Sequence, residues 1–106
     1  MEPEHCHSEA NLDMYERVLW QMREKIRTRQ YVMTLHAEEE MNDDDLTVFD
    51  VERAILTGEV TERQEDHVTG EWKYLINGQS IHGDSIEVVA KISVTSKLVI
   101  VTVYRE

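Results

Sequence analysis

The chain has few of the features that brace a protein covalently or anchor it in a membrane. Its 106 residues include one cysteine, Cys6, and one proline. A lone cysteine cannot form an internal disulfide, so packing and hydrogen bonds must hold the fold, as is usual in a reducing compartment. The longest apolar run, Leu98–Val103, is far shorter than the roughly 20 residues of a membrane helix, and no apolar segment follows a basic start. We therefore expect a cytoplasmic protein.

Motifs of several enzyme classes are also missing. The sequence has no glycine-rich phosphate loop, no G-x-S-x-G elbow and no CxxC pair, which argues against nucleotide-binding, serine-hydrolase and thioredoxin-like functions. The run His5-Cys6-His7 holds potential metal ligands, but adjacent residues point in different directions. The run Asp43-Asp44-Asp45 lacks the alternating ligands and the glycine of an EF-hand loop. We expect neither a metal nor a cofactor.

The charge is strongly one-sided and concentrated in the middle of the chain. The net charge is -11, and twelve acidic but only two basic residues lie between His36 and Asp66, whereas residues 71–106 are balanced. General nucleic-acid binding relies on clustered Lys and Arg side chains that contact phosphates. The composition therefore leaves room for a local polyanion site but does not indicate one.

The first half of the sequence predicts helices. Residues 1–9 show no apolar period and are expected to be a flexible tail, with residues 10–106 forming a single domain. An apolar stripe from Leu12 to Ile26 predicts an amphipathic helix. A short strand over 31–35 and a short helix over 36–41 follow. Thr47 and Asp50 have the spacing of a capping box that begins a helix over 48–57, and Gly58 is expected to be its left-handed C-cap.

The second half predicts strands. The period becomes two over 59–64, 72–77 and 86–93, and a last run over 98–105 is apolar on both faces from Leu98 to Val103; short turn segments separate these runs. Consecutive strands joined by short turns usually pair antiparallel. We therefore predict an α+β fold, in which N-terminal helices pack on a mainly antiparallel sheet of four or five strands.

The residues that offer chemistry are scattered polar side chains. His36 is a candidate general base, because histidine side chains ordinarily change charge near physiological pH. A structural role, in which the ring caps the following helix, fits the sequence equally and is the one we prefer. Lys73 and Lys91 lie in predicted strands with apolar neighbours, where a solvent-facing lysine and a phosphate contact are both consistent with the pattern. Only their clustering in space distinguishes these alternatives.

Three segments carry a family resemblance. The run Tyr31-Val32-Met33-Thr34-Leu35-His36-Ala37-Glu38-Glu39-Glu40-Met41, the later run Val51–Val60 with its Gly-Glu-Val, and the ending Leu98–Tyr104 together resemble the bacterial domain-of-unknown-function family 4258. The resemblance spans about residues 12–106. It implies a small domain with a RelE-like fold, related to RelE-like toxins and often paired with a YgiT-type zinc-finger antitoxin. Similar toxins are metal-independent endoribonucleases that act on messenger RNA.

The resemblance also suggests roles for particular residues. RNA cleavage needs a base for the ribose 2′-hydroxyl, cations for the phosphate and an acid for the leaving oxygen. On this reading His36 or Tyr104 transfers protons, Lys73 and Lys91 hold charge, and Arg63 contacts RNA. We place Arg105 among the RNA-binding candidates as well.

Two other functions compete with the ribonuclease. The acidic middle segment suits a non-enzymatic interaction module that docks a basic partner, and, less favoured, acidic helices that mimic nucleic acid. A ribonuclease predicts that Arg63, Lys73, Lys91 and Tyr104 converge on one groove. An interaction module predicts that they are scattered and that an apolar patch is exposed.

Overall fold

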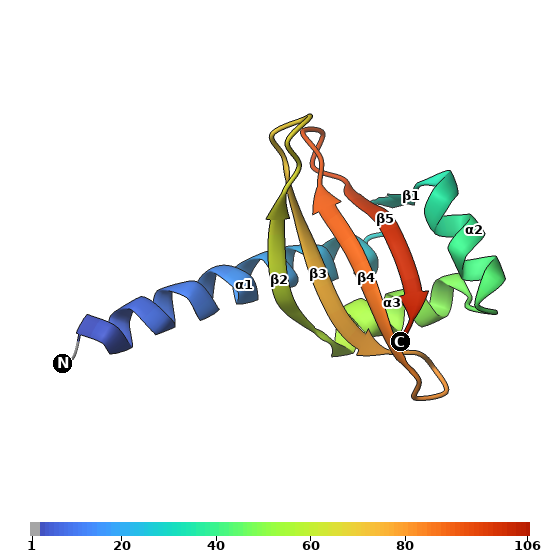
Figure 1. Cartoon of the computed structure of the whole chain (residues 1–106), viewed down its shortest axis with the longest axis horizontal. Helices are drawn as coiled ribbons and strands as arrows, with labels where there is room; N and C mark the ends of the chain where they lie inside the picture. The colour runs from blue at the N-terminus through green and yellow to red at the C-terminus, as the bar shows by residue number, and fades with distance from the viewer. Residues whose placement is uncertain (1–2) are drawn as a thin grey trace.

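Three helices and a five-stranded sheet make up the α+β fold (Figure 1). The structure is a computed structural model that describes the backbone of residues 3–106 and the side chains of residues 14–106. The helices are α1 (Pro3–Arg27), α2 (Leu35–Asp43) and α3 (Val48–Thr57), and the strands are β1 (Tyr31–Met33), β2 (Glu59–Glu65), β3 (Trp72–Gln79), β4 (Ser85–Ile92) and β5 (Leu98–Arg105). The predicted fold class is confirmed.

The sheet has the strand order β1-β5-β4-β3-β2. Strands β2 to β5 form antiparallel pairs, as their short connections predict. Strand β1 joins beyond β5 and runs parallel to it, with Tyr31 opposite Leu98. The register shifts between Val60 and Glu62 of β2 and between Val89 and Ala90 of β4, as expected of β-bulges.

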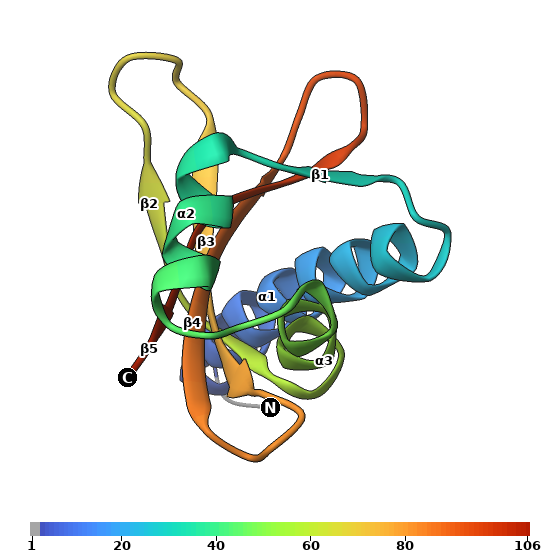
Figure 2. The ribbon, with the colours of Figure 1, turned by 90° about the vertical axis from the view of Figure 1, so that its right-hand side faces the viewer.

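One face of the sheet carries the core. Figure 2 shows the sheet nearly edge on, with α1 and α3 on one side and α2 at the β5 edge. Alternate strand residues point toward α1 and α3 and are fully buried; they include Ile76, Ile86, Val88, Ala90, Leu98, Ile100 and Val103. Helix α1 contributes Leu19, Met22 and Ile26 to the same cluster. Within the described residues, no helix is long and apolar enough to cross a membrane.

Helix α3 lies unusually close to β3. A Cβ atom on Gly78 would lie 2.3 Å from the carbonyl oxygen of Ala54, and one on Gly58 would lie 2.4 Å from that of Asn77. The expected left-handed conformation of Gly58 is wrong, because its φ is -91°. Glycine is needed here for close packing and not for a positive φ.

The sequence predicted the start of α3 correctly but not the starts of α1 and α2. The capping box of Thr47 and Asp50 is present, and α3 spans the predicted residues. The first helix begins at Pro3, earlier than expected, and proline is well suited to a first helical turn. The cap of α2 is Thr34, whose hydroxyl accepts a hydrogen bond from the Ala37 N–H at 3.1 Å. The proposed capping role of His36 is therefore wrong.

Helix α2 closes the part of the β5 edge that β1 does not reach. The Val103 N–H donates to Glu40 Oε1 and the Arg105 N–H donates to Asp44 Oδ2, each at 3.0 Å. Side-chain carboxylates thus occupy positions that carbonyl groups of a neighbouring strand would fill. An exposed row of backbone donors is a common site of unwanted strand pairing, and this edge is protected from it.

Candidate functional site

The face of the sheet opposite α1 and α3 is the candidate site, and we refer to it as the open face. Figure 1 looks onto it, with α1 and α3 behind the strands. Residues directly opposite each other in neighbouring strands share a face of the sheet. The register therefore assigns these residues to the open face: Leu75 and Asn77 of β3, Glu87, Val89 and Lys91 of β4, and Val99, Thr102 and Tyr104 of β5. Its centre is made of half-buried apolar side chains.

One end of the open face carries two lysines and two carboxylates. Lys73 and Lys91 lie one residue beyond the paired residues Tyr74 and Ala90, so they share this end. Lys91 Nζ lies 2.7 Å from Glu71 Oε1, and this hydrogen bond holds the pKa of Glu71 below its ordinary value. The pKa of Asp66 is also lowered, mainly by hydrogen bonds from N–H groups of the turn that follows it and to a smaller extent by the charges of the two lysines. The positive charge is therefore largely compensated.

The other end of the open face is acidic. The Tyr104 hydroxyl donates a short hydrogen bond to Glu87. This bond, with partial burial and the charges of Glu87, Glu106 and Glu40, raises the pKa of Tyr104 to about 12. The phenol is consequently protonated at neutral pH and lies in the negative field of three carboxylates.

The polar groups at the two ends of the open face do not converge. Tyr104 is opposite Glu87, and Lys91 lies four residues further along the same strand. Four strand residues span about 13 Å. Lys91 Nζ bonds to Glu71 and the Tyr104 hydroxyl bonds to Glu87, so the two groups do not converge on one phosphate in this arrangement.

The remaining predicted residues lie elsewhere. His36 is exposed on α2, with its Nε2 3.4 Å from Glu40 Oε2. Arg63 is on the helix-covered side of the sheet, where its guanidinium lies 4.2 Å from the centre of the Trp72 ring. Arg105 Nη2 donates to the Asp44 carbonyl at 2.7 Å. The six predicted residues thus form one lysine pair and four separate positions.

Sequence reasoning missed the carboxylates that define the open face. Glu87 accepts the hydrogen bond of Tyr104 and the charge of Glu106 also raises its pKa, and Glu71 pairs with Lys91. The alternation in 86–91, with buried Ile86, Val88 and Ala90, does indicate that Glu87 and Lys91 share the opposite face. Their partners depend on the register between strands, which that alternation does not contain.

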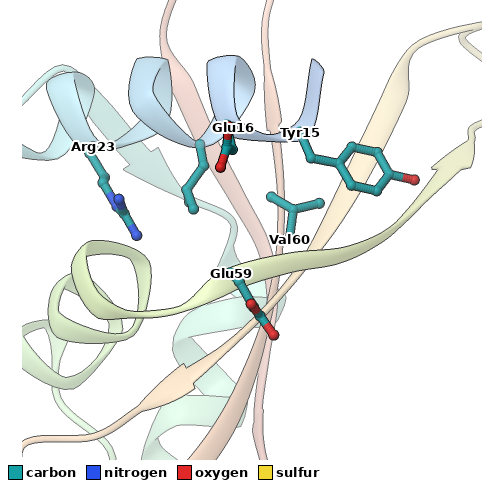
Figure 3. Close-up of a pocket in the computed structure, with 6 residues that line it drawn as sticks. Tyr15, Glu16, Arg23, Glu59 and Val60 are labelled. Carbon is teal, nitrogen blue, oxygen red and sulfur yellow. The ribbon is translucent and has the colours of Figure 1, made fainter. Parts of the chain in front are cut away.

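A separate hollow lies between α1 and β2, and Figure 3 shows it. Its volume is about 280 Å³, and its lining residues are Tyr15, Glu16, Leu19, Arg23, Glu59 and Val60. The Arg23 guanidinium turns toward α3, where Nε donates to the Ile55 carbonyl at 3.0 Å and Nη2 donates to the Gly58 carbonyl at 2.9 Å. Arg23 therefore joins α1 to the end of α3.

No cluster of potential metal ligands is present among the described side chains. The His5-Cys6-His7 run lies outside those side chains. The Asp43-Asp44-Asp45 run ends α2 and leads into the next turn, and Asp44 bonds to β5 through both its carboxylate and its carbonyl.

Comparison with protein families identifies the chain at the level of its family. The family model described as Domain of unknown function (DUF4258) matches residues 33–105. This chain belongs to that family, as the resemblance of its three segments suggested. No curated protein and no solved structure matches it.

Proposed function

We propose that this chain is a non-enzymatic protein-interaction domain whose open face binds a basic partner. The observation that carries the proposal is the group of carboxylates around Tyr104, contributed by Glu40, Glu87 and Glu106. They border an apolar centre that no helix of the described chain covers. Apolar surface with a charged rim is typical of a protein-binding site. A partner with apolar residues and neighbouring Lys or Arg residues complements both features.

The electrostatics of the open face favour a basic protein over RNA. The carboxylates around Tyr104 repel phosphates, and the nearest lysine in β4 is already paired with Glu71. Attraction between opposite charges accelerates association and disfavours partners of the wrong sign. The separation of Lys91 from Tyr104 supports the same conclusion, because binding does not require the two residues to meet.

We propose a YgiT-type zinc-finger protein as the partner class, which is the pairing that the family resemblance implies. The test is a calorimetric titration of the zinc-loaded partner into wild-type protein, Glu87→Lys and Glu39→Lys. The control residue Glu39 is exposed on α2 and gives the same change in net charge. We expect Glu87→Lys to weaken binding roughly tenfold and Glu39→Lys to have little effect. Equal losses in both variants, or no binding by the wild type, would contradict the proposal.

The second candidate function is a toxin-like, metal-independent messenger-RNA endoribonuclease. The specific observation in its favour is that Lys73 and Lys91 lie together on an uncovered sheet face that also holds Tyr104. In this function the lysines would hold the phosphate and Tyr104 would protonate the leaving oxygen, which requires Lys91 to leave Glu71 and Tyr104 to leave Glu87. RNA and the antitoxin-like zinc-finger protein would then be the partners.

Induced expression in a bacterial host tests this second function. Wild type, Lys91→Ala and Tyr104→Phe are compared, with growth and messenger-RNA integrity measured together. Growth arrest with RNA cleavage that both variants abolish would support the ribonuclease, and cleavage by purified protein in chelator would support metal independence. Normal growth with intact RNA would leave the interaction domain as the better explanation.

A further inference from the structure

The two edges of the sheet differ in how their backbone groups are satisfied. At the β5 edge, β1 pairs with Leu98–Ile100, and α2 carboxylates accept hydrogen bonds from Val103 and Arg105. At the other edge, β2 pairs with β3 on one side and with no further strand of the described chain on the other. The outward N–H and C=O groups of β2 therefore remain available to another strand.

The open edge is acidic. Glu59, Glu62 and Glu65 of β2 are exposed, and so is Glu16 of the adjacent helix α1. The one basic residue of β2, Arg63, is half-buried against Trp72 and Met14. Glu59 and Glu62 lie opposite Asn77 and Leu75, which assigns both to the open face. A strand that pairs with β2 would therefore meet two carboxylates along one of its own faces.

The hollow beside β2 adds a second feature to this edge. Val60 points into it toward α1, and the Tyr15 ring lies at one end (Figure 3). Its 280 Å³ suit one long side chain whose aliphatic part contacts Leu19 and Val60. Lysine and arginine bury such aliphatic stems while their charged ends remain in solvent. The carboxylate of Glu16, on the rim, is placed to pair with that charge.

We infer that β2 accepts an extended segment of a partner protein as a sixth strand. This segment carries Lys or Arg at the alternate positions that face Glu59 and Glu62, and one further Lys or Arg on its other face, where the hollow lies. Strand addition of this kind gains affinity from main-chain hydrogen bonds and specificity from alternate side chains. The inference rests on the proposed function for the basic character of the partner. The carboxylates of β2 also disfavour a second copy of this chain, because like charges directly opposite each other destabilise strand pairs.

The test uses a synthetic peptide of about nine residues in which lysine and valine alternate, with one valine replaced by lysine to occupy the hollow. Binding is measured by calorimetry at physiological salt for wild type, E59K/E62K and E38K/E39K. The second double variant is the matched control, because Glu38 and Glu39 are exposed on α2 and the change in net charge is the same. Hydrogen exchange identifies the backbone amides that the peptide protects. A peptide with two adjacent central prolines tests whether the main chain is needed, because one of the two missing N–H groups must face β2.

We expect E59K/E62K to weaken peptide binding roughly tenfold, because two attractive cross-strand pairs become repulsive. The control E38K/E39K should stay within about twofold of wild type, since salt screens distant charges. Protection should appear in β2, and the proline peptide should not bind. Equal losses in both variants, protection confined to another element, binding by the proline peptide, or no binding by wild type would each overturn strand addition.

The Glu87→Lys variant separates this inference from the proposed function. Glu87 is on β4, two strands from β2, so the variant should bind the peptide as wild type does while binding the zinc-finger partner more weakly. If the zinc-finger partner binds through the open face but the peptide does not bind, strand addition is wrong and the proposed function stands. If the peptide protects β2 but no zinc-finger protein binds, the proposed partner class is wrong.

Discussion

The carboxylate of Glu40 accepts a hydrogen bond from the backbone N–H of Val103, with Oε1 3.0 Å from the nitrogen. One helical turn later, Asp44 does the same for Arg105. The spacing of the two acceptors along the helix matches the spacing of the two donors along the strand, because four helical residues rise about 6 Å and two strand residues rise about 6.7 Å. A helix with acceptors four residues apart can therefore serve successive outward N–H groups of a strand. Two of the many acidic residues in the middle segment are structural for this reason.

Replacing Glu40 by alanine should destabilise the fold. The Val103 N–H would lose its acceptor at a partly buried position, and we expect the free energy of unfolding to fall by about 1–2 kcal/mol. Glu40→Gln keeps an acceptor oxygen and should cost less. Urea unfolding at neutral pH measures both. The exposed neighbour Glu39 is the control, and a similar loss in Glu39→Ala would mean that the bond to Val103 is not the cause.

Replacing Gly78 by alanine should be more damaging than the same change at Gly70. The added Cβ would lie 2.3 Å from the Ala54 carbonyl oxygen and 2.7 Å from its Cα, so α3 would have to move. We expect a loss of about 3 kcal/mol or more. Gly70 has open space around it but a φ of +77°, which costs alanine only about 1 kcal/mol. Thermal or urea unfolding of the two variants compares these costs, and equal losses would rule out the proposed clash.

Much of the fold could be predicted where the determining interactions are local. The capping box of Thr47 and Asp50 set the start of α3, and the short turns set the antiparallel pairing of β2 to β5. The parallel pairing of Tyr31 with Leu98 joins residues far apart in sequence. No local pattern specifies that pairing, and the place of β1 beside β5 was not predicted.

The site was harder to predict because a one-residue shift in a strand exchanges its two faces. The register shift between Val60 and Glu62 turns Arg63 onto the side of Tyr74 and α1. Simple alternation from the inward-facing Val60 would have directed Arg63 to the open face instead. The ribonuclease interpretation grouped Arg63 with Lys73 and Lys91, and the bulge separates them. A bulge depends on pairing with a particular neighbour, so the strand's own sequence does not reveal it.

The stability contributed by Asp50 should depend on pH. Burial raises the pKa of this carboxyl, but hydrogen bonds from the Ile81 N–H and from the N–H and hydroxyl of Thr47 outweigh it, so the pKa lies below its ordinary value. A lowered folded-state pKa contributes stability that is present above the unfolded pKa of about 3.9 and is lost as the pH falls through the folded value. Asp50→Asn should therefore cost about 1–2 kcal/mol at neutral pH.

Urea unfolding of wild type and Asp50→Asn between pH 7 and pH 2.5 measures this dependence. The difference between the two proteins should be constant above about pH 5 and should shrink at lower pH. The control is Asp45→Asn, because Asp45 is exposed and its φ of 55° is well tolerated by asparagine. A difference that does not change with pH would show that the Asp50 charge is irrelevant.

The protonation of Tyr104 decides which role it can have if the chain cleaves RNA. The hydrogen bond to Glu87 is the main cause of its pKa of about 12, because ionisation would place a phenolate beside a carboxylate. Glu87→Gln removes that charge, so we expect the pKa to fall toward the ordinary value of about 10. Absorbance titration of tyrosinate measures the shift, with the exposed Glu62→Gln as control. An unchanged titration in Glu87→Gln would refute the assigned cause.

With a pKa of about 12, Tyr104 is almost entirely protonated near pH 7 and is able to donate a proton but not to accept one. A ribonuclease built on this open face would therefore need its general base elsewhere.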